Sequence, residues 1–253
     1  MKFRLTLGCA LMGAAAFAIA SGTDAEIKGS NVCGLMNVPS TAKETLIAVP
    51  WVTVGGSDAT MKVANLVKTD TLTAGDELYF YDGSTYYRWV LTDGKWMPTS
   101  TTKKANDKKT DVTITAPGAD YAIARGKGLW LVRQDTTKEI WLYGQHDASA
   151  VSVAVTAGTA AAPAYTLIAN PNTADYDLNA KSVTGAVGDK IILDGGATLY
   201  TYKAAGWTRK VATQKTVGTK TMTVKKDSTE GCTIPAGQGA WYVSVGGNPT
   251  IAW

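Results

Sequence analysis

Two stretches of the sequence contain a G-x-G pair that could hold a phosphate. They read IARGKGLWLV from Ile123 and IPAGQGAWYV from Ile234. A phosphate loop presents backbone amides at the start of a helix, but strand formers without a helical period follow both pairs. The lysine of the first pair is Gln238 in the second. We therefore interpret the recurring residues as a structural motif, a glycine turn that leads into a core strand whose tryptophan packs inside the module: Gly126, Gly128, Trp130, Gly237, Gly239 and Trp241.

The chain offers few groups for acid, base or metal chemistry. Its single histidine, His146, lies in a polar linker, so neither a zinc site nor a nucleophile–histidine pair can be assembled. Asp76 and Asp189 each follow a glycine before an expected strand, where an aspartate usually accepts hydrogen bonds from turn amides. The D-x-D-x-N spacing from Asp175 suits oxygen ligands, but the glycine and the distal glutamate of a calcium loop are missing. We expect no catalytic residue, no metal and no cofactor.

Aromatic residues crowd one expected hairpin, between Glu77 and Val90. Alternation along its first strand places Tyr79 and Tyr81 on one face and Phe80 on the other. Exposed aromatic rows stack on sugar rings, whereas buried ones fill cores and bury a large area each. Copy two of a repeat described below has Ile191 to Leu193 at the matching strand, which favours a core role for part of the row. The residues expected to be exposed, and to bind carbohydrate if any do, are Tyr86, Tyr87 and Trp89.

The first twenty residues predict export. Lys2 and Arg4 precede an apolar run from Leu5 to Ile19, and an A-x-A site ends at Ala20, with cleavage after Ala25 as the alternative. The run is too short to span a membrane comfortably.

Cleavage also removes Cys9 and leaves two cysteines, Cys33 and Cys232. An even pair in an oxidising compartment predicts one disulfide, and two buried thiols are the alternative.

Charge excludes a nucleic-acid partner. The full chain has 25 lysines and arginines against 21 aspartates and glutamates, and the leader takes two bases with it, which leaves 23 against 21. No basic footprint for nucleic acid remains. The densest basic run, KKANDKK from Lys103 to Lys109, contains polar residues and is interpreted as a solvated loop tip. The partners we expect are a surface glycan or another surface protein, without a membrane span after leader removal.

The sequence contains two copies of one unit. TLIAVP from Thr45 recurs as TLIANP from Thr166, and in both copies a Gly-Asp turn, a hairpin and the G-x-G motif follow in that order. Short runs rich in Val, Ile, Thr, Tyr and Trp alternate with turn signals at the rhythm of a sandwich or barrel. We predict an all-β fold of two tandem, related β-sandwich-like modules, with a barrel as the alternative, packed together. Copy one covers residues 26–145, a linker covers 146–150, and copy two covers 151–253.

The motif order resembles a bacterial family. TLIANP, a Gly-Asp turn with a Tyr/Trp hairpin, and IPAGQGAW look like the poorly characterised secreted β-sandwich repeat modules of Bacteroidetes, Verrucomicrobia and Kiritimatiellae-type bacteria. The resemblance covers residues 32–253 and implies an extracytoplasmic β-sandwich with no catalytic residues to carry over. Copy one departs from the pattern, with Val49-Pro50-Trp51 in place of the N-P and Ala124 to Lys127 in place of P-A-G-Q.

These observations predict an exported, non-enzymatic structural or interaction protein. It would act in assembly or adhesion at the bacterial cell surface, outside the cell or in the periplasm. The alternative is a carbohydrate-binding protein that uses an exposed aromatic face.

Overall fold

The computed structural model describes residues 33–54, 60–104, 110–145, 147, 149–193, 197–217, 220–247 and 249–253. The expected signal peptide, residues 1–20, and the linker residue His146 lie outside the described residues. Most of the predicted loop tip, residues 105–109, also lies outside them.

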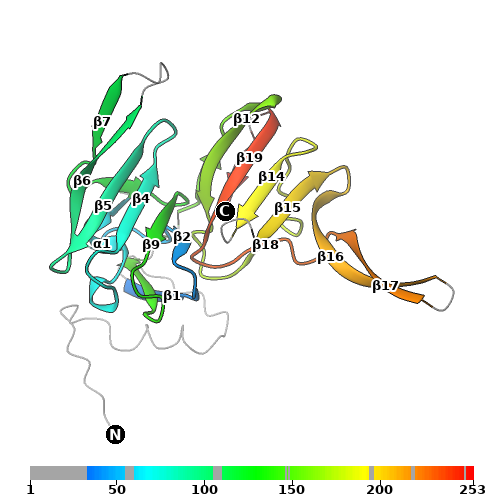
Figure 1. Ribbon diagram of the computed structural model, residues 1–253, viewed down its shortest axis with the longest axis horizontal. Helices are drawn as coiled ribbons and strands as arrows, with labels where there is room; N and C mark the ends of the chain where they lie inside the picture. Colours follow the sequence, from blue (N-terminus) through cyan, green and yellow to red (C-terminus); the bar gives the residue numbers. More distant parts are fainter. Residues whose placement is uncertain are drawn as a thin grey trace, which may run out of the picture.

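Within the described residues, each copy of the repeat folds into ten strands in the same chain order. The two copies lie side by side (Figure 1). Copy one contains β1 (Cys33–Val38), β2 (Glu44–Ala48), β3 (Thr60–Lys62), β4 (Glu77–Tyr81), β5 (Tyr86–Thr92), β6 (Lys95–Lys104), β7 (Asp111–Thr115), β8 (Ala122–Ala124), β9 (Gly128–Val132) and β10 (Ile140–Gln145), with the short helices α1 (Val63–Leu66) and η2 (Thr69–Thr71). Copy two contains β11 (Ser152–Ala154), β12 (Gly158–Ala169), β13 (Tyr176–Asp177), β14 (Lys190–Leu193), β15 (Thr198–Lys203), β16 (Gly206–Val217), β17 (Lys220–Ser228), β18 (Thr233–Ile234), β19 (Gly239–Gly247) and β20 (Thr250–Ala252).

The two copies also share one sheet topology. Their six-stranded antiparallel sheets have the orders β2-β9-β4-β5-β6-β7 and β12-β19-β14-β15-β16-β17. Two-stranded ladders complete each copy: β1 with β10 and β3 with β8 in copy one, and β11 with β20 and β13 with β18 in copy two. The prediction of an all-β fold with two related modules packed together is confirmed, and the large sheets remain open rather than closing into barrels across the described ranges.

Each core lies between the large sheet and the short ladders of its own module. Along β4, Leu78 and Phe80 point into the core of copy one, while Tyr79 and Tyr81 are half-buried on the opposite face. Residues of β1, β3, β8 and β10 close this core from the other side, and copy two repeats the arrangement. The predicted alternation of Tyr79, Phe80 and Tyr81 is therefore confirmed.

The alignment of the two hairpins differs by one residue from the sequence comparison. Tyr79 pairs with Trp130, and Ile192 pairs with Trp241. Tyr79 therefore corresponds to Ile192, whereas the sequence comparison matched it with Ile191. This difference matters because a shift of one residue moves every side chain to the other face of a sheet.

The two aspartates that follow glycines fasten turns, as predicted. Asp76 is buried and accepts hydrogen bonds from the amides of Thr73 (2.9 Å) and Gln134 (2.6 Å). Asp189 is buried in the same way and accepts bonds from the amides of Ala186 (2.8 Å) and Val245 (2.7 Å). These carboxylates tie the strand that follows each turn to the end of β9 or β19.

The predicted disulfide is wrong in this structure, where Cys33 and Cys232 are not joined. Cys33 begins β1 of copy one and pairs with Gln145 of β10. Cys232 is buried in the core of copy two, where its thiol lies 3.5 Å from the carbonyl oxygen of Trp207. The two cysteines thus belong to different modules, and a cysteine count carries no information on that separation.

The modules dock through reciprocal hydrogen bonds. The amide of Ala48 donates to the carbonyl of Gly237 (2.8 Å), and the amide of Ala169 donates to the carbonyl of Gly126 (2.9 Å). Ala48 and Ala169 occupy the same position of the TLIA repeat, and the two glycines occupy the same position of the G-x-G motif. Exchange of equivalent contacts is the mark of a two-fold interface, so the junction between the modules is a pseudo-two-fold.

No helix in the described part of the chain is long and apolar enough to cross a membrane.

Candidate carbohydrate-binding face

The three aromatic residues predicted to be exposed do not lie on one face. The side chain of Tyr86 is 43% exposed, whereas Trp89 is 0% exposed. Tyr87 and Trp89 alternate with Tyr86 along β5 and point into the module, where the Trp89 indole donates a hydrogen bond to the carbonyl of Pro117 (2.8 Å). The prediction that Trp89 is exposed is therefore wrong, and Tyr87 is half-buried against the core.

A different set of aromatic rings gathers on the opposite face of the sheets, at the junction of the modules. We call this set the junction cluster, and its members are Tyr81, Tyr86, Trp130, Tyr165 and Trp241. Ring centroids lie 4.7 Å apart for Tyr81 and Tyr86, 6.0 Å for Tyr81 and Trp241, 5.8 Å for Trp130 and Trp241, and 6.4 Å for Tyr165 and Trp241. Tyr86 and Tyr165 are 43% and 54% exposed, and the other three rings are half-buried. The cluster therefore crosses from copy one to copy two with accessible rings at both ends.

Strand alternation explains why the two tryptophans face outward. In β9, Leu129 and Leu131 are fully buried on either side of Trp130. In β19, Ala240 and Tyr242 flank Trp241 in the same way. The prediction that these tryptophans pack inside the modules is wrong. They pack against each other across the junction.

The glycines of the repeat motif make this close approach possible. A Cβ atom at Gly128 would lie 3.0 Å from the carbonyl oxygen of Ile168, and one at Gly239 would lie 3.2 Å from that of Ile47. Both of those oxygens belong to the other module. The φ angles of Gly126 (+78°) and Gly237 (+70°) confirm the predicted glycine turn. The motif therefore docks one module on the other.

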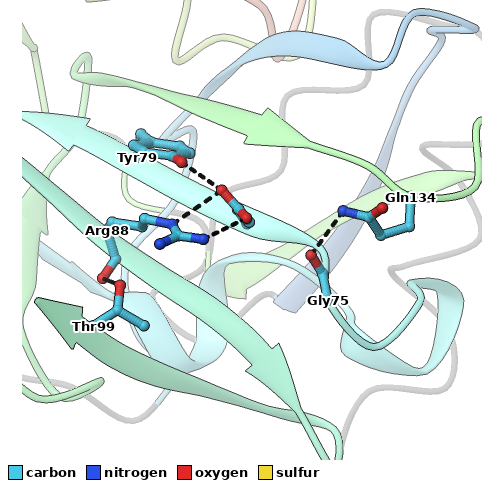
Figure 2. A network of polar contacts seen from close by, with 6 residues as sticks. Gly75, Tyr79, Arg88, Thr99 and Gln134 are labelled. Atoms are coloured by element: carbon cyan, nitrogen blue, oxygen red, sulfur yellow. Dashed lines mark hydrogen bonds and ion pairs between the residues drawn. The ribbon is translucent and has the colours of Figure 1, made fainter. Parts of the chain in front are cut away.

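Charged groups adjoin the junction cluster on the same face of copy one. The side chains of Tyr79 and Arg88 point at one carboxylate (Figure 2). The hydrogen bonds identify it as that of Glu77, which accepts from Arg88 with its two oxygens at 3.0 and 2.6 Å. The Tyr79 hydroxyl donates to the same carboxylate, and the guanidinium carbon lies 6.0 Å from the centre of the Tyr79 ring. The bonds from Arg88 lower the pKa of Glu77, and burial together with the bond to Glu77 raises that of Tyr79. At neutral pH the face thus presents a fixed carboxylate, a guanidinium and a phenol beside the rings.

The rings of the junction cluster lie on the same strand pairs as the polar network around Glu77. Tyr79 lies directly opposite Trp130 on one side and Arg88 on the other. Tyr86, two pairs further along the hairpin and on the same face, lies opposite Tyr81. An apolar patch of aromatic rings and a row of hydrogen-bonding groups therefore lie on one face of the sheets.

Sequence reasoning placed Trp130 and Trp241 in the core and did not single out Tyr165. A usable signal was present, because a tryptophan between two leucines in a strand must face away from the side on which the leucines lie. Tyr165 precedes the repeated TLIA run in copy two and has Glu44 at the matching place in copy one, so comparison of the copies gave no hint of it.

The other polar candidates have structural partners. Asp175 accepts a bond from the amide of Ala236, and Asp177 accepts bonds from the amides of Asn179 and Ala180. In the ranges that the structure describes, no group of three or more His, Cys, Asp or Glu side chains could hold a metal ion.

A cavity of about 480 Å³ lies beside the junction, between the linker and the segments that follow β2 and β12. Arg125 lines it and forms an ion pair with Asp147 (3.2 Å). The same guanidinium donates to the carbonyls of Pro50 (3.2 Å) and Ser149 (3.0 Å). These bonds hold the linker against copy one, so we assign Arg125 a structural role.

The junction face combines partly exposed aromatic rings with charged groups that are already paired with one another. No protein-family model, no curated protein and no solved structure matches the chain.

Proposed function

We propose that this chain is an exported, non-catalytic protein that binds carbohydrate on its junction face. The observation that carries the proposal is the junction cluster, five aromatic rings in contact across two modules with an accessible tyrosine at each end. Aromatic side chains buried only in part supply large, rigid apolar area with a polar tip. Export is proposed from the leader-like first twenty residues.

The chemistry of a sugar ring matches both parts of this face. One face of a pyranose presents C–H groups, which pack on an aromatic ring, and its rim carries hydroxyls, which need donors and acceptors. Arg88 supplies donors and Glu77 supplies acceptors, and hydrogen bonds to charged groups are stronger than neutral ones. The mutual bond between them keeps both side chains in place before a ligand arrives, which reduces the entropy lost on binding.

A role in cell-surface assembly or adhesion is compatible with this proposal. A protein that holds surface glycan without altering it would act as a structural or adhesive component. Any resemblance to secreted bacterial β-sandwich modules is consistent with that setting and adds no residue to the site.

The test is a glycan-array screen of the whole chain, followed by titration calorimetry with the best saccharide. The decisive variant is Tyr86→Ala with Tyr165→Ala, because these two rings are the most exposed of the cluster. An aromatic contact is worth about 1 kcal/mol, so the loss of two should weaken binding by roughly 30-fold.

Met97→Ala is the matched control. Met97 is 48% exposed and pairs with Val90 on the same face of the sheet, but it lies outside the junction cluster. Its variant should bind as the wild type does. The proposal is wrong if the array shows no saccharide, or if the double tyrosine variant keeps full affinity.

A further inference from the structure

The two outer edges of the molecule are built differently. The large sheets meet at the junction through β2 and β12, so β7 and β17 are the terminal strands at the far ends (Figure 1). In the described part of the chain, β7 pairs only with β6, and β17 only with β16. β17 carries Lys225 and Lys226, whereas β7, with the sequence DVTIT, carries no lysine. Lysines on an edge strand discourage pairing with another chain, and β7 lacks this protection.

The hydrogen-bond phase of β7 shows which of its backbone groups face outward. Just beyond the strand, the amide of Ala116 donates to the carbonyl of Thr99 on the β6 side (3.0 Å). Hydrogen-bonded and non-hydrogen-bonded pairs alternate in an antiparallel ladder, so Ile114 and Val112 bond to β6. Asp111, Thr113 and Thr115 then direct their N–H and C=O groups away from the sheet.

Side-chain contacts support the same phase. Thr115 and Ser100 hydroxyls lie 2.7 Å apart, and Thr113 and Thr102 hydroxyls lie 3.1 Å apart. Opposed side chains approach most closely at non-hydrogen-bonded pairs. Both hydroxyl contacts fall at positions assigned as non-hydrogen-bonded toward β6.

We propose that β7 is a self-association edge that pairs antiparallel with β7 of a second copy of this chain, about a two-fold axis at Thr113. Thr113 then lies opposite Thr113 of the second copy, and Asp111 lies opposite Thr115 of the second copy. Val112 lies opposite Ile114 of the second copy, at a position where β-branched side chains make a favourable cross-strand contact. No pair of like charges is opposed in this register, and Asp111 is already neutralised by Lys104 at 2.8 Å.

The sequence of β7 favours a second copy of this chain as its partner. The five residues of β7 are self-complementary in the antiparallel direction, because apolar residues lie opposite apolar residues and polar residues opposite polar ones. The strand is short, so the buried area is small and association is weak and dependent on concentration. The large sheets of the two copies become continuous through the shared edge.

The first test is sedimentation velocity of the full chain over a roughly thousandfold range of concentration, wide enough for a weak interface. We expect the mass to rise toward that of a dimer. Thr113→Pro should abolish this rise while leaving the thermal midpoint nearly unchanged, because the amide that it removes is not used by β6. Thr113→Lys is a second variant with the same expected result if the proline disturbs the strand. Met222→Lys is the control on β17, where Met222 is 49% exposed, and should leave association intact.

Cross-linking tests the register. Residues opposed in a hydrogen-bonded pair have Cα atoms about 5.5 Å apart, within disulfide range. Thr113→Cys should therefore form a covalent dimer on oxidation, whereas Thr115→Cys, opposed to Asp111, should form much less. A chain that remains monomeric at every concentration overturns the proposal. So does association that survives Thr113→Pro and Thr113→Lys, or that Met222→Lys abolishes.

Discussion

The buried thiol of Cys232 makes a quantitative prediction for the pH dependence of folding. Cys232 is 0% exposed in the core of copy two, and desolvation raises its pKa from 9.0 to about 11. A group whose pKa is higher in the folded state than in the unfolded state contributes fully to the stability of the fold at a pH below its unfolded pKa. That contribution is lost as the pH rises from the unfolded pKa through the folded pKa. Between pH 9 and pH 11 the unfolded chain therefore gains a thiolate that the folded chain resists.

The size of the effect follows from the two pKa values. At pH 10 the unfolded thiol is largely ionised and the folded one is not, which lowers the free energy of unfolding by about 1.4 kcal/mol relative to pH 8. Buried tyrosines, Tyr242 among them, also have raised pKa values, so the wild type alone does not isolate the cysteine. Cys232→Ala removes only the thiol's share and adds a pH-independent cost of about 1 kcal/mol for the lost sulfur.

The assay is urea denaturation followed by tryptophan fluorescence at pH 8 and pH 10, in reducing buffer, for both proteins. The wild type should lose about 1.4 kcal/mol more than Cys232→Ala over this interval. Equal losses in the wild type and in Cys232→Ala would show that the thiol ionises at its ordinary pKa. The buried position of Cys232 described above would then be incorrect.

Two further predictions concern the junction and the turn that supports it. Gly128→Ala and Gly239→Ala should each destabilise the fold by about 1–3 kcal/mol, because the new methyl group meets backbone of the other module; unchanged urea midpoints would show that the modules are not in this contact. Asp189→Ala should cost about 3–5 kcal/mol, because two backbone amides and the Tyr242 hydroxyl lose their shared acceptor; a loss below about 1 kcal/mol would mean that water reaches these donors.

Local sequence signals were sufficient for much of the fold. The repeat of TLIA and G-x-G predicted two related modules, because an element order that recurs must fold in the same way. The Asp82–Gly83 turn predicted the hairpin of β4 and β5, and the Gly-Asp pairs predicted buried carboxylates that accept turn amides. Each of these features depends on a few neighbouring residues.

The candidate site was harder to predict from the sequence, because it depends on how the two modules pack against each other. Trp130 and Trp241 are large and apolar, so composition favours a core position. Only the contact between modules makes an outward position favourable for them, and neither copy alone reveals that contact. Trp89 shows the converse error, since Tyr86 and Trp89 are three residues apart on one strand and must therefore point to opposite faces. The prediction of a disulfide between Cys33 and Cys232 failed for a related reason. An oxidising compartment allows a disulfide, but it does not specify the distance between two thiols.

The pseudo-two-fold at the junction gives the proposed binding face a direction. The backbone is symmetric there, but the side chains are not: Tyr79 and Arg88 of copy one correspond to Ile192 and Leu199 of copy two. A polysaccharide has two unlike ends, one reducing and one non-reducing. A face that is polar on one side and aliphatic on the other distinguishes these two ends. A polysaccharide bound across it would therefore be held in one orientation only. Divergence between the two copies thus makes a junction that is symmetric in its backbone asymmetric in its side chains.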